Sequence, residues 1–214
     1  IVEQGSLQNK SDIQYFAKSI KLDGRNIYRS PLDLNVENGK IEKPAKPTLR
    51  FGVPVFDQEG TKCGIVVFNY FGRYVIDNIK RANQETNYMQ LVNEKGYWLA
   101  GPDPKDEWAF MYSGKSEDTF ANNFPEEWAR IISEKNGQFF CSVGLFTFRM
   151  IELDVEARTK LIGTNDEDIT IKGADGAWFL ISYVPADVIP YANDENGYLI
   201  GLKRLFGLPS LLLT

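Results

Sequence analysis

Apolar residues are most concentrated in two neighbouring runs in the first third of the chain. The run Leu49–Phe56 is rich in β-branched and aromatic residues, and the run Cys63–Tyr70 is apolar almost throughout. The segment 57–60 between them has the composition of a tight turn, in which Gly60 is free to adopt a positive φ. This pattern predicts an antiparallel hairpin at the centre of a sheet, with its second strand covered on both faces.

A helical pattern precedes this hairpin at residues 11–21. Its apolar positions recur at i, i+3, i+4 and i+7, which places them in one stripe along a helix. Ser11 or Asp12 is expected to cap the helix, because either side chain can accept a hydrogen bond from an N–H group of the first turn. The stripe comprises Ile13, Phe16, Ala17 and Ile20.

Two further helices are predicted. Residues 71–82 have apolar side chains at helical spacing, and this helix is expected to connect two subdomains. Pro125 is expected to open the other helix, since the first turn does not need its missing N–H group. Asn136-Gly137 is expected to end that helix.

The remaining strands are predicted around these elements. Residues 89–100 repeat the strand–turn–strand plan of the first hairpin, and residues 138–151 form one long strand. Short strands are expected at residues 26–29 and 177–184. Residues 33–47 form a polar loop with several Asn and Pro residues, which either covers the sheet as a lid or crosses the surface.

Two stretches of this sequence resemble a known family. They are YRSPLDLNVENGKIEKPAKPTLRFGVPVFD at residues 28–57 and GIVVFNY at residues 64–70. The sequence resembles extracytoplasmic double Cache domains, which are PAS-like periplasmic sensor domains of transmembrane histidine kinases, diguanylate cyclases and chemoreceptors. The resemblance covers most of residues 7–185. Length and pattern alone indicate only an α+β domain with one large or two small cores.

The resemblance implies an α+β fold with two PAS-like (Cache) subdomains, each an antiparallel sheet flanked by helices. Residues 1–82 would form the membrane-distal subdomain and the connector helix, and residues 83–190 the membrane-proximal subdomain. The distal subdomain would be incomplete, because the family opens with a long helix and two strands that have no counterpart here. Residues 191–214 are expected to form a juxtamembrane tail. Their apolar end either approaches a membrane helix or docks on the domain as an amphipathic helix.

In amino-acid-sensing members of the family, a pocket lies between the central sheet and a lid. An aromatic pair from the helix, a Tyr and an Asp from the next strand, and an Asp from the final strand of the sheet line this pocket. Carried over by position, the resemblance and the neighbouring polar residues of this sequence give one candidate set of ligand-binding residues. It comprises Tyr15, Phe16, Tyr28, Ser30, Asn35, Arg50 and Asn69.

This sequence departs from the family pattern where the ligand's charges would be recognised. Ser30 and Asn69 stand where the family has Asp, so they offer neutral hydrogen bonds rather than charge-assisted ones. The arginine expected before the aromatic pair is Ile13 here, so an α-amino acid ligand is not supported. Arg50 could bind a carboxylate if it faces inward, with Asn35 adding an amide. In the alternative, Tyr15, Tyr28 and Phe51 fill the core, and Arg50 pairs with a surface carboxylate.

Composition removes several other functions. The chain of 214 residues contains no histidine, which excludes a Ser-His-Asp triad and a His-ligated metal site. Its net charge is −5 and its Lys and Arg residues are scattered, so no nucleic acid is expected as a partner. Cys63 and Cys141 fall in predicted strands and are expected to be buried. No cofactor is expected, since no phosphate, dinucleotide or redox motif is present.

These observations predict a non-enzymatic sensor. We expect the extracytoplasmic, periplasmic part of an inner-membrane receptor that binds an organic acid or another metabolite, with a homodimer as its assembly and an output module of the two-component type. One alternative is a ligand-free structural relay of such a receptor. A weaker one is a carbohydrate-active enzyme that uses the pairs Asp106-Glu107 or Glu126-Glu127, although adjacent carboxylates do not converge on one glycosidic bond.

Overall fold

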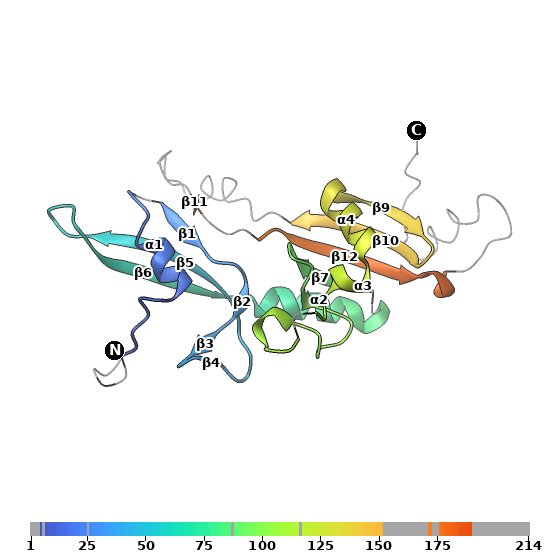
Figure 1. Cartoon of the computed structure of the whole chain (residues 1–214), viewed down its shortest axis with the longest axis horizontal. Helices are drawn as coiled ribbons and strands as arrows, with labels where there is room; N and C mark the ends of the chain where they lie inside the picture. Colours follow the sequence, from blue (N-terminus) through green and yellow to red (C-terminus); the bar gives the residue numbers. More distant parts are fainter. Residues whose placement is uncertain are drawn as a thin grey trace.

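The computed structural model describes residues 5, 7–24, 26–86, 88–115, 117–151, 171–172 and 176–189. These residues form two five-stranded sheets and a two-stranded ribbon, and a long helix joins the sheets (Figure 1). The first sheet and its ribbon comprise β1 (Ile27–Arg29), β2 (Asp33–Leu34), β3 (Val36–Glu37), β4 (Lys40–Ile41), β5 (Pro47–Phe56), β6 (Lys62–Phe71) and β11 (Ile171–Lys172). The second sheet comprises β7 (Met89–Asn93), β8 (Trp98–Ala100), β9 (Asn136–Cys141), β10 (Gly144–Ile151) and β12 (Trp178–Pro185).

The helices lie on the faces of these sheets and between them. They are α1 (Gln14–Ser19), α2 (Arg73–Thr86), α3 (Phe120–Asn123) and α4 (Pro125–Glu134), with the 3-10 helices η2 (Ala109–Met111) and η3 (Ala186–Val188). The structure confirms the α+β class with antiparallel sheets and flanking helices. In the described part of the chain, no helix is both long and apolar enough to span a membrane. The expected tail at residues 191–214 lies outside the described residues.

The first sheet is built around β5. This strand pairs antiparallel with β1 and β2 along one edge and with β6 along the other, and β11 extends the sheet parallel to β1. The predicted hairpin and its turn at Gly60 are therefore confirmed. The predicted polar loop is more ordered than expected, because its first two residues form β2 and its middle forms the β3–β4 ribbon.

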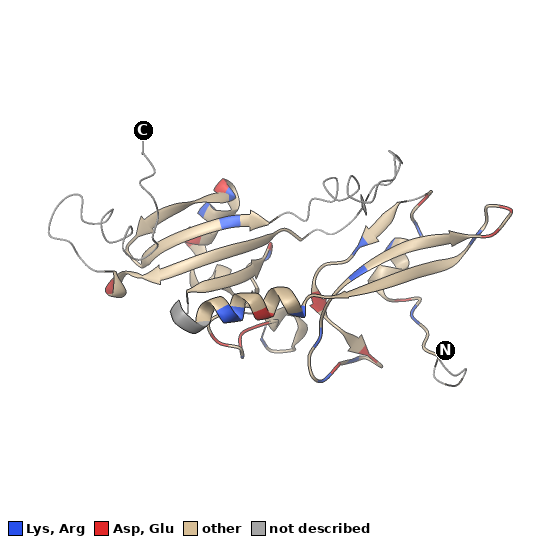
Figure 2. Cartoon of the chain, turned by 180° about the vertical axis from the view of Figure 1, so that it is seen from behind, with Lys and Arg blue, Asp and Glu red and all other residues tan. Residues whose placement is uncertain are grey.

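The prediction that the second strand of the hairpin is covered on both faces is wrong. Val66 is 57% exposed and Phe68 is 63% exposed, and both project from the same face of β6. Figure 2 shows the strand β6 almost free of charged residues. Within the described residues β6 pairs only with β5, so it is an edge strand. Its apolar composition therefore marks an exposed surface rather than a buried one.

Two predictions about helix ends are also wrong. Neither Ser11 nor Asp12 caps α1, because α1 begins later and its N-cap is Ile13, which makes no side-chain capping bond. The two predicted caps are engaged upstream, where Ser11 Oγ donates to Asp12 Oδ1 and Ser11 N donates to Asn9 Oδ1. Pro125 opens α4 as predicted, but the helix ends at Glu134, and its C-cap is Lys135, with a positive φ of 66°, rather than Asn136-Gly137.

The predicted long strand over 138–151 is two strands. Asn136-Gly137 opens β9 instead of following the helix as a loop, and β9 turns back into β10 at residues 142–143. Gly144 is required at this turn, since a Cβ there would lie 2.2 Å from the carbonyl oxygen of Val184. The buried-cysteine prediction is wrong for Cys63, which is exposed, while Cys141 is half-buried and both thiols are free.

The second sheet has the order β8-β7-β12-β10-β9 and is antiparallel throughout. Residues 89–100 form the predicted second hairpin, and residues 178–185 form the predicted final strand. One face packs against α3 and α4 through a cluster of aromatic and aliphatic side chains. Its buried members are Val92, Trp98, Phe120, Ile131, Phe139, Phe146, Phe148, Phe179 and Ile181.

The other face of the second sheet shares a core with the first sheet. Leu34 and Leu49 of the first sheet, Ile76 and Ile79 of α2, and Leu91 of β7 belong to one buried cluster. The two sheets are therefore held together by apolar packing around α2, which lies against β7 and β8 (Figure 1). Burial of this kind contributes about 25 cal/mol for each Å² of apolar surface that leaves water.

Gly96 provides a test of the second hairpin. Its φ is +83°, and a Cβ at this position would lie 2.3 Å from Ala121 Cβ. Gly96→Ala should lower the free energy of unfolding by about 3 kcal/mol, because it adds a steric clash to left-handed strain. Gly60→Ala is the matched control, since Gly60 has φ +82° with nothing within 4 Å. Urea unfolding that gives equal losses for both variants would contradict the close packing of α3 on this turn.

Candidate functional site

The helix α1 lies against one face of β5, and Gly52 permits this approach. A Cβ on Gly52 would lie 2.0 Å from Ser19 Oγ. Ser19 is fully buried and its hydroxyl donates to the carbonyl oxygen of Tyr15 at 2.6 Å. Because alternate residues of a strand face the same side, Arg50 projects to the face of β5 that α1 covers.

Arg50 is the centre of a polar cluster under α1. Its side chain is only 7% exposed. The guanidinium donates to Asp33 Oδ1 at 2.5 Å and to Asn35 Oδ1 at 2.8 Å, and its carbon lies 5.4 Å from the centre of the Tyr15 ring. A buried arginine needs such partners, because an unpaired charge away from water is costly.

The backbone of Arg50 is held as firmly as its side chain. Its N–H donates to Ser30 Oγ at 2.9 Å, and its carbonyl oxygen accepts from the N–H of Ser30 at 2.8 Å. Both bonds bind β5 to the segment that follows β1. The Arg50 side chain therefore starts from a fixed backbone position, which favours a defined geometry for its guanidinium.

The structure brings four predicted residues together. Tyr15, Ser30, Asn35 and Arg50 all take part in the cluster. Arg50 does face inward, as a carboxylate-binding role requires, although a carboxylate of the chain already pairs with it. The alternative interpretation expected Arg50 to pair with a carboxylate of the chain at the surface. The structure has such a pair, but its arginine is buried.

The other three predicted residues lie around this cluster. Tyr28 is buried and pairs with Gly52 across β1 and β5, so it projects to the same face as Arg50. Asn69 stands directly opposite Arg50 on β6 and shares that face, but it is exposed. Phe16 is half-buried on α1, next to Tyr15.

Asp33 is the residue that sequence reasoning missed. It lies in β2 opposite Thr48, two residues along β5 from Arg50. Burial raises the pKa of Asp33, and the attraction and hydrogen bond of Arg50 offset part of this rise. A signal was present in the Asp33-Leu-Asn35 sequence, because alternation in a short strand places both polar residues on one face.

The cluster retains hydrogen-bonding capacity. A guanidinium has five N–H donors, and Asp33 and Asn35 engage two of them. Among the described residues no other group accepts a hydrogen bond from this side chain. A ligand carboxylate could therefore share the guanidinium with Asp33 or displace it, while Asp33 could pair with a ligand ammonium group.

The carboxylate pairs are explained without a reaction. Glu107 is buried, and its carboxylate pairs with Lys80 at 2.8 Å. Glu126 and Glu127 lie in the first turn of α4, where the helix dipole favours negative charge. The described residues contain no group of three or more Cys, Asp or Glu side chains placed to hold a metal ion.

One family and several solved structures are similar to this chain. The profile of the family described as "Bacterial histidine kinase, sensor domain" matches residues 1–162. No curated protein matches the sequence. The similar solved structures are each less than 25% identical to this chain, so their similarity establishes the fold alone.

A domain of a sensory box/GGDEF family protein from Vibrio parahaemolyticus is 22% identical with a TM-score of 0.63, over 84% of this chain and 60% of that one. The extracellular domain of the histidine kinase vpHK1S-Z8 is also 22% identical with a TM-score of 0.61, over 83% of this chain and 57% of that one. The ligand-binding domain of the Pseudomonas aeruginosa PAO1 amino acid chemoreceptor PctC, in complex with GABA, is 12% identical with a TM-score of 0.51, over 86% of this chain and 65% of that one. The chain thus spans about 60% of the length of the structures it matches.

The buried ion pair generates a test with a defined pH dependence. Arg50→Met should lower the free energy of unfolding by about 3 kcal/mol at about pH 7, because it leaves Asp33 part-buried without its partner. The variant should raise the pKa of Asp33 further, since the guanidinium is the group that lowers it. A carboxyl whose folded pKa exceeds its unfolded pKa binds its proton more tightly in the folded chain, so its contribution to stability falls as the pH rises through that interval.

The deficit of Arg50→Met should therefore shrink as the pH falls toward about 5, as measured by urea unfolding at both values. The control is the double variant Arg50→Met with Asp33→Asn, which has no carboxylate to titrate at this position. A deficit of Arg50→Met that stays constant over this range, or the same pH dependence in the double variant, would show that Asp33 is not the titrating partner.

Proposed function

This chain belongs to the family of bacterial histidine kinase sensor domains, and we propose that it senses a small molecule outside the cytoplasm for a transmembrane receptor. The observation that supports the recognition step is the inward-facing Arg50 with Asp33, Asn35 and Tyr15 around it. A buried cation with unused donors, placed between a sheet and a covering helix, provides a recognition group for an anionic ligand.

The proposal extends to the whole protein. The sensor occupies the periplasmic side of the inner membrane, the protein is anchored there, and it acts as a homodimer whose output module follows the two-component plan. The sensor performs no chemistry of its own. Residues 1–82 act as the membrane-distal subdomain and residues 83–190 as the membrane-proximal one, with α2 as the connector.

The ligand of this site is a small organic acid. Its carboxylate binds Arg50, and Asn35 and Ser30 orient it, while Tyr15 and Phe16 of α1 and Tyr28 of β1 supply the apolar walls. Asn69 closes the outer side from β6. Asp33 adds an acidic group to a site in which Ser30 and Asn69 replace the acidic residues of the family pattern. A ligand with both a carboxylate and an amine is therefore the second choice. GABA, the ligand of the PctC structure, has that combination of charges.

Signalling requires the ligand to favour one conformation of the domain over another, because equal affinity for two states shifts neither. The covering helix is the element that a ligand would move. A guest between Arg50 and Tyr15 changes the separation between α1 and β5, and β2 transmits the change because Asp33 belongs to the same cluster.

A ligand-free relay is the second candidate. The pair between Arg50 and Asp33 favours it, since a carboxylate of the chain itself already pairs with the guanidinium. In that case Arg50 serves only to hold α1, β2 and β5 together, and the two sheets transmit strain through their shared core.

The ligand proposal is tested by thermal unfolding of the 214-residue chain with a library of organic acids and amino acids that includes succinate and GABA. At least one compound at about 100 times its Kd should stabilise the chain by about 2.7 kcal/mol. Arg50→Ala should abolish the shift because the charged recognition group is lost. Tyr15→Leu and Asn35→Ala, which keep the ion pair, should weaken it.

Arg81→Ala is the control for loss of a cation, since Arg81 is exposed on α2 and contacts only Asn78 by a side-chain hydrogen bond among the described residues. A hit that binds Arg50→Ala, Tyr15→Leu and the wild type equally would place the ligand elsewhere. A library without hits would favour the relay.

A further inference from the structure

A cavity lies where the two sheets meet α2. Its volume is about 430 Å³, and three separate parts of the chain line it. Leu34 and residues 44–47 come from the first sheet and its loop, residues 73–80 come from α2, and residues 104–115 come from the segment after β8. The size falls within the range of about 300–1,000 Å³ that is usual for small-molecule pockets.

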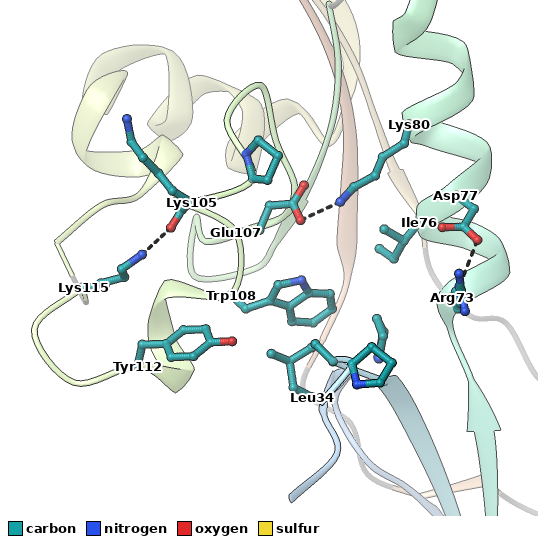
Figure 3. A pocket seen from close by; sticks show the side chains of 14 residues that line it. Leu34, Arg73, Ile76, Asp77, Lys80, Lys105, Glu107, Trp108, Tyr112 and Lys115 are labelled. Atoms are coloured by element: carbon teal, nitrogen blue, oxygen red, sulfur yellow. Dashed lines mark hydrogen bonds and ion pairs between the residues drawn. The ribbon is translucent and has the colours of Figure 1, made fainter. Parts of the chain in front are cut away.

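The centre of this cavity is apolar and built on an unusual backbone. Figure 3 shows the Trp108 ring facing Leu34, with Ile76 of α2 nearby. Trp108 has φ 60° and ψ 25°, which is the left-handed region that bulky residues rarely adopt. The backbone N–H of Trp108 donates to the carbonyl oxygen of Trp98 at 2.8 Å, so the surrounding structure fixes this backbone conformation. Backbone strain of this kind costs free energy and is concentrated at functional sites.

The rim of the cavity is cationic. Four positive and two negative side chains line it, which leaves a net charge of +2 in a chain whose total is −5. Lys80 pairs with Glu107 at 2.8 Å and Arg73 with Asp77 at 3.3 Å. The other two cations are Lys105 and Lys115.

Lys115 is the cation most available to a guest. Its Nζ donates to the carbonyl oxygen of Lys105 at 2.6 Å and lies 5.9 Å from the centre of the Tyr112 ring. Among the described residues no carboxylate pairs with it, whereas Lys105 pairs with Asp103 at 2.7 Å. Lys115 and the Tyr112 ring thus present a positive charge beside an aromatic surface at the cavity mouth (Figure 3).

We propose that this cavity binds an aromatic carboxylic acid, as a second ligand site distinct from the Arg50 cluster. The aromatic ring of the guest packs against the apolar wall formed by Trp108, Ile76 and Leu34, and its carboxylate pairs with Lys115. Offset or edge-to-face contacts with Trp108 and Tyr112 favour an aromatic ring over an aliphatic chain. A neutral guest would leave Lys115 without an anionic partner among the described residues.

Such a guest would touch both halves of the molecule. Leu34 belongs to β2, the two-residue strand whose other residue, Asp33, holds Arg50. The N–H of Leu34 also donates to Met111 Sδ at 2.9 Å, which links β2 to the segment after β8. Occupation of the cavity would therefore stabilise the contact between the sheets, and β2 would connect it to the Arg50 cluster.

The test is isothermal titration calorimetry of the full 214-residue chain with benzoate, phenylacetate and indole-3-acetate. At least one acid should bind with a Kd tighter than about 1 mM. The corresponding amides, which keep the ring and lose the charge, should bind at least about tenfold more weakly. Lys115→Gln should weaken binding of the acid by about fivefold to tenfold.

Lys95→Gln is the matched control, because Lys95 is an exposed lysine in the β7–β8 turn. This variant should bind the acid as tightly as the wild type does. Ala45→Phe fills the cavity from an exposed loop position and should abolish binding without removing a charge. Circular dichroism of each variant checks that it is folded.

Three results would overturn the proposal: no acid binds, the amides bind as tightly as the acids, or Lys115→Gln and Ala45→Phe both bind like the wild type. Arg50→Ala separates this site from the sensor site. This variant should keep its affinity for the aromatic acid. The proposal of a sensor site at Arg50 and the proposal of an aromatic-acid site in this cavity can therefore be refuted independently.

Discussion

The first sheet depends on the burial of the positive charge of Arg50. Arg50 projects from the central strand β5 to the face covered by α1, and it cannot remain there without partners. Asp33 from β2, Asn35 after it and the Tyr15 ring from α1 supply those partners. One guanidinium therefore fixes the positions of a helix, a short strand and a loop relative to β5. The same arrangement makes this point of the sheet suited to recognise an anion.

The second structural constraint is the core shared by the two sheets. The first sheet, α2 and one face of the second sheet contribute to a single buried cluster. The strand β2 takes part in both constraints, since Asp33 faces the Arg50 cluster and Leu34 faces the shared core. Alternation of side chains in a strand produces this division, because neighbouring residues project to opposite faces. The strand β2 thus contributes one residue to each constraint.

The same alternation explains what could be inferred from the chain. Both hairpins, the connector helix and the opening of α4 at Pro125 follow from local signals, namely turn residues, apolar periodicity and the position of proline. The resemblance to sensor domains added Tyr15 and Ser30, and the polar position on the neighbouring strand added Arg50. The structure brings these three residues together. The break at residues 142–143 was missed because Ser-Val has no strong turn composition, and only Gly144 marks it.

The sequence by itself determined the elements whose information is local: the two hairpins, the helices α1, α2 and α4, the turns at Gly60 and Gly96, and the absence of histidine chemistry. Only the tertiary structure decided which faces are buried and which charges meet. The apolar strand β6 became an exposed edge, and Asp33 became the partner of Arg50 although 17 residues separate them. Periodicity describes the two faces of an element but carries no information on what packs against each face. Burial and ion pairing are set by that packing, so they appear only when the chain is folded.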